Sequence, residues 1–99
     1  MRVPLGEEDR VGVEWEQEGG RIVVFVVNDV AEGGGKPRSA VRFDSAHGFP
    51  HKEVCYPDDT VGQKERLPEG DLHLLVDSAI DDIKSHWPTY RARFEKWLK

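Results

Sequence analysis

The sequence has a single cysteine, Cys55, and this scarcity limits the covalent and metal chemistry open to the chain. One thiol cannot form an internal disulfide, and it cannot build a zinc site of the multi-cysteine kind. Cys55 stands between Val54 and Tyr56 in a strand-like segment, a setting typical of a buried, unreactive thiol. We therefore expect a protein of a reducing compartment, the cytoplasm.

Long apolar runs are also absent. The longest, residues 22–27, is far shorter than the roughly 20 residues that cross a bilayer. Residues 1–9 lack the apolar centre of a signal peptide. We expect a soluble, unexported protein with no membrane partner.

A basic excess is absent as well. The chain has 14 lysine and arginine residues against 19 aspartate and glutamate residues, with a formal net charge of −5 and a pI near 5.3. Such a chain offers no extended positive field, which argues against a general nucleic-acid coat protein. The acidic excess lies mostly in residues 1–37, so a small phosphate-facing site elsewhere is still compatible with the composition.

The first two thirds of the chain follow strand patterns. Apolar and polar side chains alternate in the first segment, and residues 22–27 are apolar on both parities, as in a strand covered on both faces. Five strands are predicted, at residues 11–16, 22–27, 40–44, 52–56 and 61–67. Loops are expected at residues 28–29, 33–35 and 45–51. The connections are short, which favours an antiparallel meander.

From Leu72 onward, apolar residues recur every three or four positions as far as Trp97, the period of a helix. Pro88 interrupts this stretch and removes one backbone hydrogen bond, so the helix either kinks or is followed by a second helix. We predict a single α+β domain over residues 1–99. Its antiparallel meander sheet of about five strands is packed by a C-terminal kinked helix or by two tandem helices.

Reactive side chains are densest in residues 42–53. Asp44, His47 and His51 have the composition of a metal site with two histidines and one carboxylate, but no fourth ligand is evident. A glycine and a proline between the histidines argue against a helix that would place both imidazoles on one side. We predict no metal and no cofactor, and keep a metal site as the lesser alternative.

A metal-free interpretation needs only cationic and proton-transferring groups. One imidazole can act as general base while a second imidazole or a lysine protonates the leaving group, which suits RNA cleavage through its own 2′-hydroxyl. We predict His47 as the base, His51 or Lys52 as the acid, and Asp44 as the group that orients an imidazole. Arg42 would hold a phosphate oxygen, and cations near the helix end would offset the acidic balance. The candidate residues are, for catalysis, Asp44, His47, His51 and Lys52 and, for substrate binding, Arg42, Arg91 and Arg93.

The same residues also have a structural interpretation. His47 would cap a turn by hydrogen bonding to backbone, and Asp44 would pair with Arg42 on one strand face. Lys52 would then be a solvated surface lysine. The pattern of residue types alone leaves both interpretations open.

Residues 42–51 read Arg-Phe-Asp-Ser-Ala-His-Gly-Phe-Pro-His. This segment resembles the signature of a group of small uncharacterised prokaryotic proteins and, more distantly, of the TumE-like toxin family of toxin–antitoxin pairs. Residues 82–94 also resemble the helical end of that group. The resemblance implies an α+β domain whose polar loop is the functional centre, with toxin members acting on RNA or interfering with cell growth.

Two functions of different classes follow. The first is a toxin-like protein that acts on RNA as a metal-independent ribonuclease, with RNA and an antitoxin-like protein as its partners. The alternative is a non-enzymatic module in which the same loop grips a partner protein or a small ligand. The sequence specifies neither the substrate nor the oligomeric state.

Overall fold

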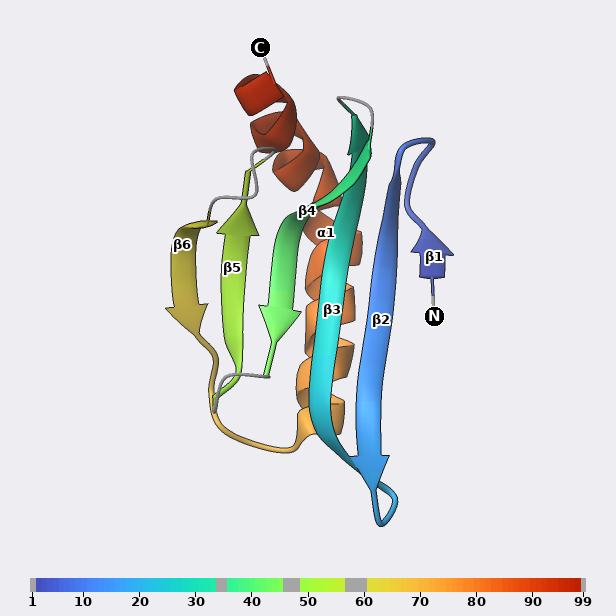
Figure 1. Cartoon of the computed structure of the whole chain (residues 1–99), viewed down its shortest axis with the longest axis vertical. Helices are drawn as coiled ribbons and strands as arrows, with labels where there is room; N and C mark the ends of the chain where they lie inside the picture. Colours follow the sequence, from blue (N-terminus) through green and yellow to red (C-terminus); the bar gives the residue numbers. More distant parts are fainter. Residues whose placement is uncertain (1, 34–35, 46–48, 57–60, 99) are drawn as a thin grey trace.

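The computed structural model describes residues 2–33, 36–45, 49–56 and 61–98. Six antiparallel strands form one sheet whose spatial order follows the chain, and one long helix packs on one face of it (Figure 1). The elements are β1 (Arg2–Pro4), β2 (Asp9–Glu18), β3 (Arg21–Gly33), β4 (Lys36–Asp44), β5 (His51–Cys55), β6 (Val61–Arg66) and α1 (Leu72–Leu98). The α+β class and the meander are confirmed.

The sheet has one more strand than predicted. β1 is short and pairs with β2 through Val3 and Val11. Val3 and Leu5 pack against the buried core, which ties this N-terminal segment down. Three residues are too few to show a strand period, so the sequence pattern missed β1.

β3 is longer than predicted, because it continues through Asn28 and Asp29, where a loop was expected. Asn28 pairs with Arg42, and its side-chain oxygen accepts a hydrogen bond from Ser39 Oγ at 2.9 Å. Asp29 pairs with Val41 and is fully buried. Ladder pairing on both sides of β3 therefore overrides the turn preference of these two residues. Residues 34–35 lie outside the described part of the chain.

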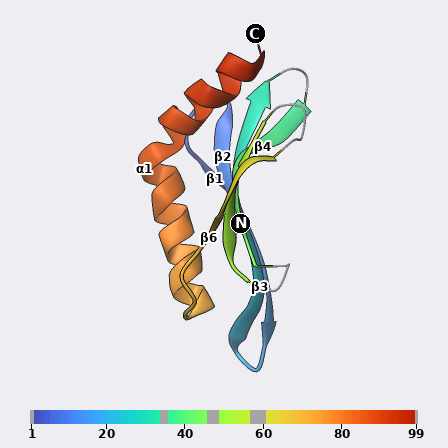
Figure 2. The ribbon, with the colours of Figure 1, turned by 90° about the vertical axis from the view of Figure 1, so that its left-hand side faces the viewer.

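The C-terminal segment forms one helix with Pro88 inside it, so the first of the two alternatives, a kinked helix, is confirmed. Asp71 caps its start by accepting a hydrogen bond from the backbone N–H of His73 at 2.8 Å. Pro88 lies inside the helix, which changes direction partway along its length (Figure 2). Within the described residues, no helix combines the length and the apolar character needed to span a membrane.

The core lies between α1 and one face of the sheet. Its buried apolar residues include Val11, Val13, Phe25, Val27, Val41 and Phe43 from the strands and Val76, Ala79, Ile83, Tyr90 and Phe94 from the helix. α1 packs against β2, β3 and β4. β5 and β6 lie to one side of it (Figure 1). We call the face that contacts α1 the helix face and the opposite one the open face.

Candidate functional site

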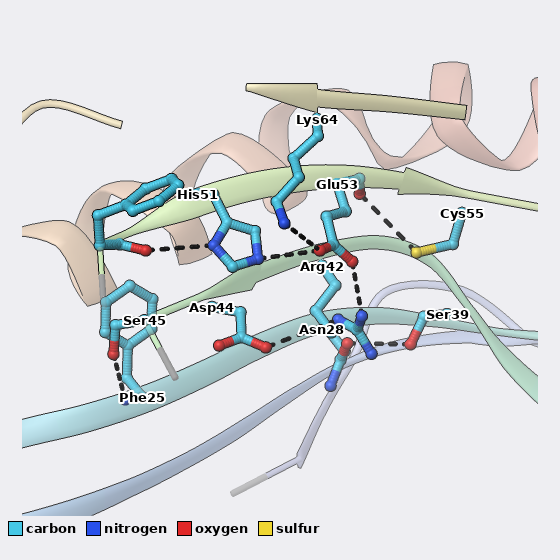
Figure 3. Close-up of polar contacts among 11 residues, drawn as sticks. Phe25, Asn28, Ser39, Arg42, Asp44, Ser45, His51, Glu53, Cys55 and Lys64 are labelled. Atoms are coloured by element: carbon cyan, nitrogen blue, oxygen red, sulfur yellow. Dashed lines mark hydrogen bonds and ion pairs between the residues drawn. The ribbon is translucent and has the colours of Figure 1, made fainter. Parts of the chain in front are cut away.

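The alternation of side chains along β4 and β5, and the pairing register of these two strands, place four polar residues together on the open face. Arg42 and Asp44 are two apart on β4, and His51 and Glu53 are two apart on β5, so each pair shares a face. The register places Arg42 opposite Glu53 and Asp44 opposite His51. Figure 3 shows the four side chains side by side. Three of the predicted site residues are therefore brought together.

Glu53 is the centre of this group. Its carboxylate accepts a hydrogen bond from Arg42 Nη2 at 2.6 Å, lies 2.9 Å from His51 Nε2, and lies 3.9 Å from Lys64 Nζ (Figure 3). Burial alone would raise the pKa of Glu53, but the hydrogen bond and charge of Arg42, with His51, outweigh it and lower that pKa. The carboxylate stays ionised and joins a cation to an imidazole.

The His51 ring is fully buried and held from two sides. Nε2 faces the Glu53 carboxylate, and Nδ1 lies 3.2 Å from the carbonyl oxygen of Phe49. Both of these partners are acceptors, so a proton on either ring nitrogen finds a partner. The Phe49 ring packs edge-on at 5.9 Å between centroids, and the Arg66 guanidinium lies 4.7 Å from the Phe49 centroid. The orientation of the imidazole is thus fixed by its surroundings.

Asp44 lies beside Arg42 at the end of β4. Its Oδ2 is 3.9 Å from Arg42 Nε, and its side chain is buried. The next residue, Ser45, ties the chain to β3, since its Oγ accepts the backbone N–H of Phe25 at 2.9 Å (Figure 3). The pairing of Asp44 with Arg42 that the structural interpretation predicted is therefore present. Arg42, at 37% side-chain exposure, is the most accessible of the four central residues.

Lys52 does not join this group, which corrects the expectation that it and His51 could serve one site. It stands between His51 and Glu53 on β5, so alternation turns it to the helix face. There its Nζ donates to the Tyr90 hydroxyl at 2.9 Å and lies 3.5 Å from Asp82 Oδ2. It is also not the solvated lysine of the structural interpretation. Burial alone would lower the pKa of Lys52, but the contacts with Tyr90 and Asp82 outweigh it and raise that pKa.

Arg91 serves the acidic N-terminal region instead of a phosphate site. Its guanidinium contacts Glu8 at 2.7 Å and Glu95 at 2.8 Å, and donates to the backbone carbonyl of Glu32 at 2.6 Å. Its Nη1 also lies 3.5 Å from Asp9. These contacts are on the helix face, so Arg91 does not border the Arg42 group.

Arg93 is also on the helix face, where its guanidinium lies 5.4 Å from the centroid of the Tyr90 ring. It shares a cavity with Lys52. The predicted site is therefore divided between the two faces of the sheet.

His47 lies outside the described residues, so its predicted role as general base stays a prediction. Among the residues that the structure does describe, no three or more histidine, cysteine, aspartate or glutamate side chains are arranged to hold a metal ion.

Sequence reasoning missed the role of Glu53, although a signal was present. Glu53 stands in the polar segment already singled out, but His51 was assigned to the loop before the predicted strand at residues 52–56. β5 begins one residue earlier, at His51, and this places His51 and Glu53 on one face. Lys64 and Arg66 reach the same face from β6, opposite Glu53 and His51. The position of Lys64 and Arg66 on this face follows only from the pairing register of β5 with β6.

A second polar centre was also missed. Asp9 and Asp29 are both buried on the helix face, and three of their four carboxylate oxygens have no hydrogen-bond partner among the described residues. Burial and the nearby charge of Asp9 raise the pKa of Asp29 to about 7. A proton shared by two adjacent carboxyl groups accounts for the burial of both.

The family described as Domain of unknown function (DUF7718) matches residues 1–99, and the chain belongs to this family. No match to the chain was found among curated proteins or solved structures. A function for the chain has to come from the chemistry of its own residues. The likeness to TumE-like toxins stays a prediction.

Proposed function

We propose that this member of the DUF7718 family acts on RNA as a toxin-like protein, with the open face of β4 and β5 as its site. The observation that supports this is the Glu53 bridge. One buried carboxylate holds Arg42 at 2.6 Å and His51 at 2.9 Å, so a phosphate-binding cation and a proton-transferring imidazole form one preorganised unit (Figure 3).

Arg42 is the substrate-binding member of this unit. A guanidinium has five N–H donors, and the contact with Glu53 uses one at Nη2. Its Nε is buried and lies 3.9 Å from Asp44 Oδ2, so a phosphate is reached by the remaining Nη donors. Side-chain exposure of 37% leaves the group accessible to a phosphate, which guanidinium recognises by paired hydrogen bonds. Lys64 and Arg66 extend the positive charge beside it.

His51 is the acid in the proposed reaction. Its Nδ1 lies 3.2 Å from the Phe49 carbonyl oxygen, a longer contact than the 2.9 Å between Nε2 and Glu53. A leaving 5′-oxygen of RNA replaces that carbonyl and takes the proton from Nδ1, while Glu53 stabilises the ring from Nε2. His47 accepts the proton of the attacking 2′-hydroxyl. The products are a 2′,3′-cyclic phosphate and a 5′-hydroxyl. Because His51 is fully buried and the displaced carbonyl is a backbone group, access requires a shift of the Phe49 backbone together with its ring.

Purified protein and a fluorescent RNA oligonucleotide test the proposal directly. The Arg42→Gln variant should cleave the RNA at least about tenfold more slowly than the wild type, because a charge-assisted phosphate contact is lost. Arg42→Lys should recover part of the loss, since it restores the charge without the planar fork. Cleavage is measured on denaturing gels.

Arg10→Gln is the matched control. Arg10 lies on the open face of β2 and pairs with Glu32 at 2.8 Å, so the substitution removes the same charge and a similar ion pair away from the site. The proposal predicts wild-type cleavage for this variant. Intact RNA with the wild-type protein would reject the ribonuclease function.

The alternative is a non-enzymatic module on the same face. The internal pairing of Arg42, Asp44, His51 and Glu53 favours it, because a satisfied network also stabilises a fixed binding surface. An antitoxin-like protein is the partner that the toxin interpretation predicts for this face. RNA bound without cleavage, or a protein bound without RNA, would support the alternative.

A further inference from the structure

A cavity of about 370 Å³ lies on the helix face, between the second half of α1 and the strands β5 and β6. α1 packs on β2, β3 and β4, and β5 and β6 extend past it (Figure 1). The cavity lies between α1 and the two strands β5 and β6. Its lining includes Lys52, Val54, Gln63, Glu65, Tyr90 and Arg93. The volume lies within the range of small-molecule sites.

Lys52 presents a positioned donor to this cavity. An ammonium group carries three protons, and its contacts to Tyr90 and Asp82 use two of them. The side chain keeps 20% of its exposure, so the third proton is accessible from the cavity. The Tyr90 hydroxyl also donates to Asp82, which fixes the position of the phenol and of the lysine against it.

Arg93 presents a second cation from the helix. Its guanidinium lies 5.4 Å from the centroid of the Tyr90 ring, and Lys52 Nζ lies 5.2 Å from the same centroid. Arg42 and Arg91 both have carboxylate partners. The ion pairs within the described part of the chain give Arg93 none. In a chain with an acidic excess, an arginine without a carboxylate partner beside a cavity keeps its donors for a ligand.

The charges around the cavity define the ligand. Among the described residues, Glu65 is the one carboxylate in the lining. Lys64 also borders the cavity, but its ammonium lies 3.9 Å from Glu53 on the open face. Lys52 and Arg93 therefore give the cavity two cations, with the polar amide of Gln63 beside them, a set of groups that suits a compact anion. A phosphate dianion can accept hydrogen bonds from both the ammonium of Lys52 and the planar guanidinium of Arg93.

We propose that the cavity between α1 and β5–β6 is a second binding site, which takes a small phosphate-bearing molecule through Lys52 and Arg93. The site is separate from the open face, because the two strand faces point in opposite directions. Its ligand is either free phosphate or the terminal phosphate of a nucleotide. Both share the same recognition chemistry.

Isothermal titration calorimetry tests the proposal with inorganic phosphate, adenosine 5′-monophosphate and adenosine as titrants. Phosphate and the monophosphate should bind and adenosine should not. Tighter binding of the monophosphate than of free phosphate would assign the ligand as a nucleotide, and equal binding would assign it as phosphate. Binding of adenosine as tight as that of the monophosphate would overturn the proposal, as would no binding of any titrant.

Arg93→Gln should weaken phosphate binding at least about tenfold, through loss of charged hydrogen bonds. Lys84→Gln is the matched control, since Lys84 is an exposed cation of the same helix outside the cavity lining. Equal weakening by both variants would show a general charge effect and overturn the site. The titration contains no RNA, so its failure is distinguishable from failure of the open-face proposal.

Discussion

Asp29 is the residue whose burial has the clearest consequence for stability. Its pKa is raised from 3.8 to about 7 by burial and by the charge of Asp9. The folded chain therefore keeps a proton that the unfolded chain releases as pH rises above about 4. The contribution of Asp29 to stability is full below that pH, falls as pH rises to about 7, and is lower by up to about 4 kcal/mol above it.

Asp29→Asn should remove most of this pH dependence. The amide is neutral, has the same shape and can donate a hydrogen bond to Asp9. The variant should therefore be more stable than the wild type at about pH 8 and similar to it at about pH 3.5, below the pKa of the unfolded chain. Urea unfolding at the two pH values measures the effect. Asp77→Asn, at an exposed helix position, is the control. An Asp29→Asn variant no more stable than wild type at the higher pH would contradict the shared proton.

Residue types predicted part of the candidate site. Arg42, Asp44 and His51 were singled out together, and strand alternation with the β4–β5 register does bring them together. Lys52 was assigned to the same site because His51 was expected in the preceding loop. β5 begins at His51, so alternation turns the two side chains to opposite faces. Its actual partner, Tyr90, is far away in the sequence, and only the packing of the helix on the sheet brings the two together.

At the scale of elements, the loop between β1 and β2 depends on close contact with α1. A Cβ atom at Gly6 would lie 2.8 Å from an aromatic carbon of Trp87, nearer than such atoms approach in proteins. Gly6→Ala should therefore lower the free energy of unfolding by about 1–3 kcal/mol, through overpacking against the ring. Thermal and urea unfolding measure the loss.

Gly70→Ala serves as the control, because a Cβ atom there meets nothing within 4 Å. Combining Gly6→Ala with Trp87→Phe should relieve the clash. The loss of stability caused by Gly6→Ala should therefore be smaller in the Trp87→Phe background than in the wild type. A Gly6→Ala variant as stable as Gly70→Ala would show that the loop does not pack closely on Trp87.

The elements that were predicted correctly have strong periods. The first predicted strand and the helix from Leu72 show such periods, and residues 22–27 form a continuous apolar run. The apolar stripe continues past Pro88, which is why one helix forms. Ile83 before the proline and Phe94 after it are both buried in the core, so packing maintains the helix across the lost hydrogen bond. β1 was missed because three residues show no period. The extension of β3 was missed because Asn28 and Asp29 are residue types common in turns.

At the scale of the whole molecule, the acidic excess is separated from the candidate site. Glu8 and Asp9 gather around Arg91 on the helix face, and Glu32 pairs with Arg10 on the open face of β2 and β3. Arg42, Lys64 and Arg66 also lie on the open face, but on β4 and β6, toward the other edge of the sheet. The net charge of −5 therefore excludes an extended nucleic-acid surface without excluding a local phosphate contact. Composition alone could not show this separation, because it depends on the sheet order.

Controlled expression in a bacterial host, scored by growth and by the integrity of total RNA, tests whether the Glu53 bridge supports RNA cleavage. The Glu53 bridge predicts growth arrest and RNA fragments ending in 2′,3′-cyclic phosphate with the wild type and with Arg10→Gln. Glu53→Gln, at the same soluble level and with a cooperative unfolding transition, should reduce fragment formation by at least about 100-fold, because the imidazole acid loses its partner. Normal growth with intact RNA in the wild-type culture, or full activity of Glu53→Gln, would contradict the account.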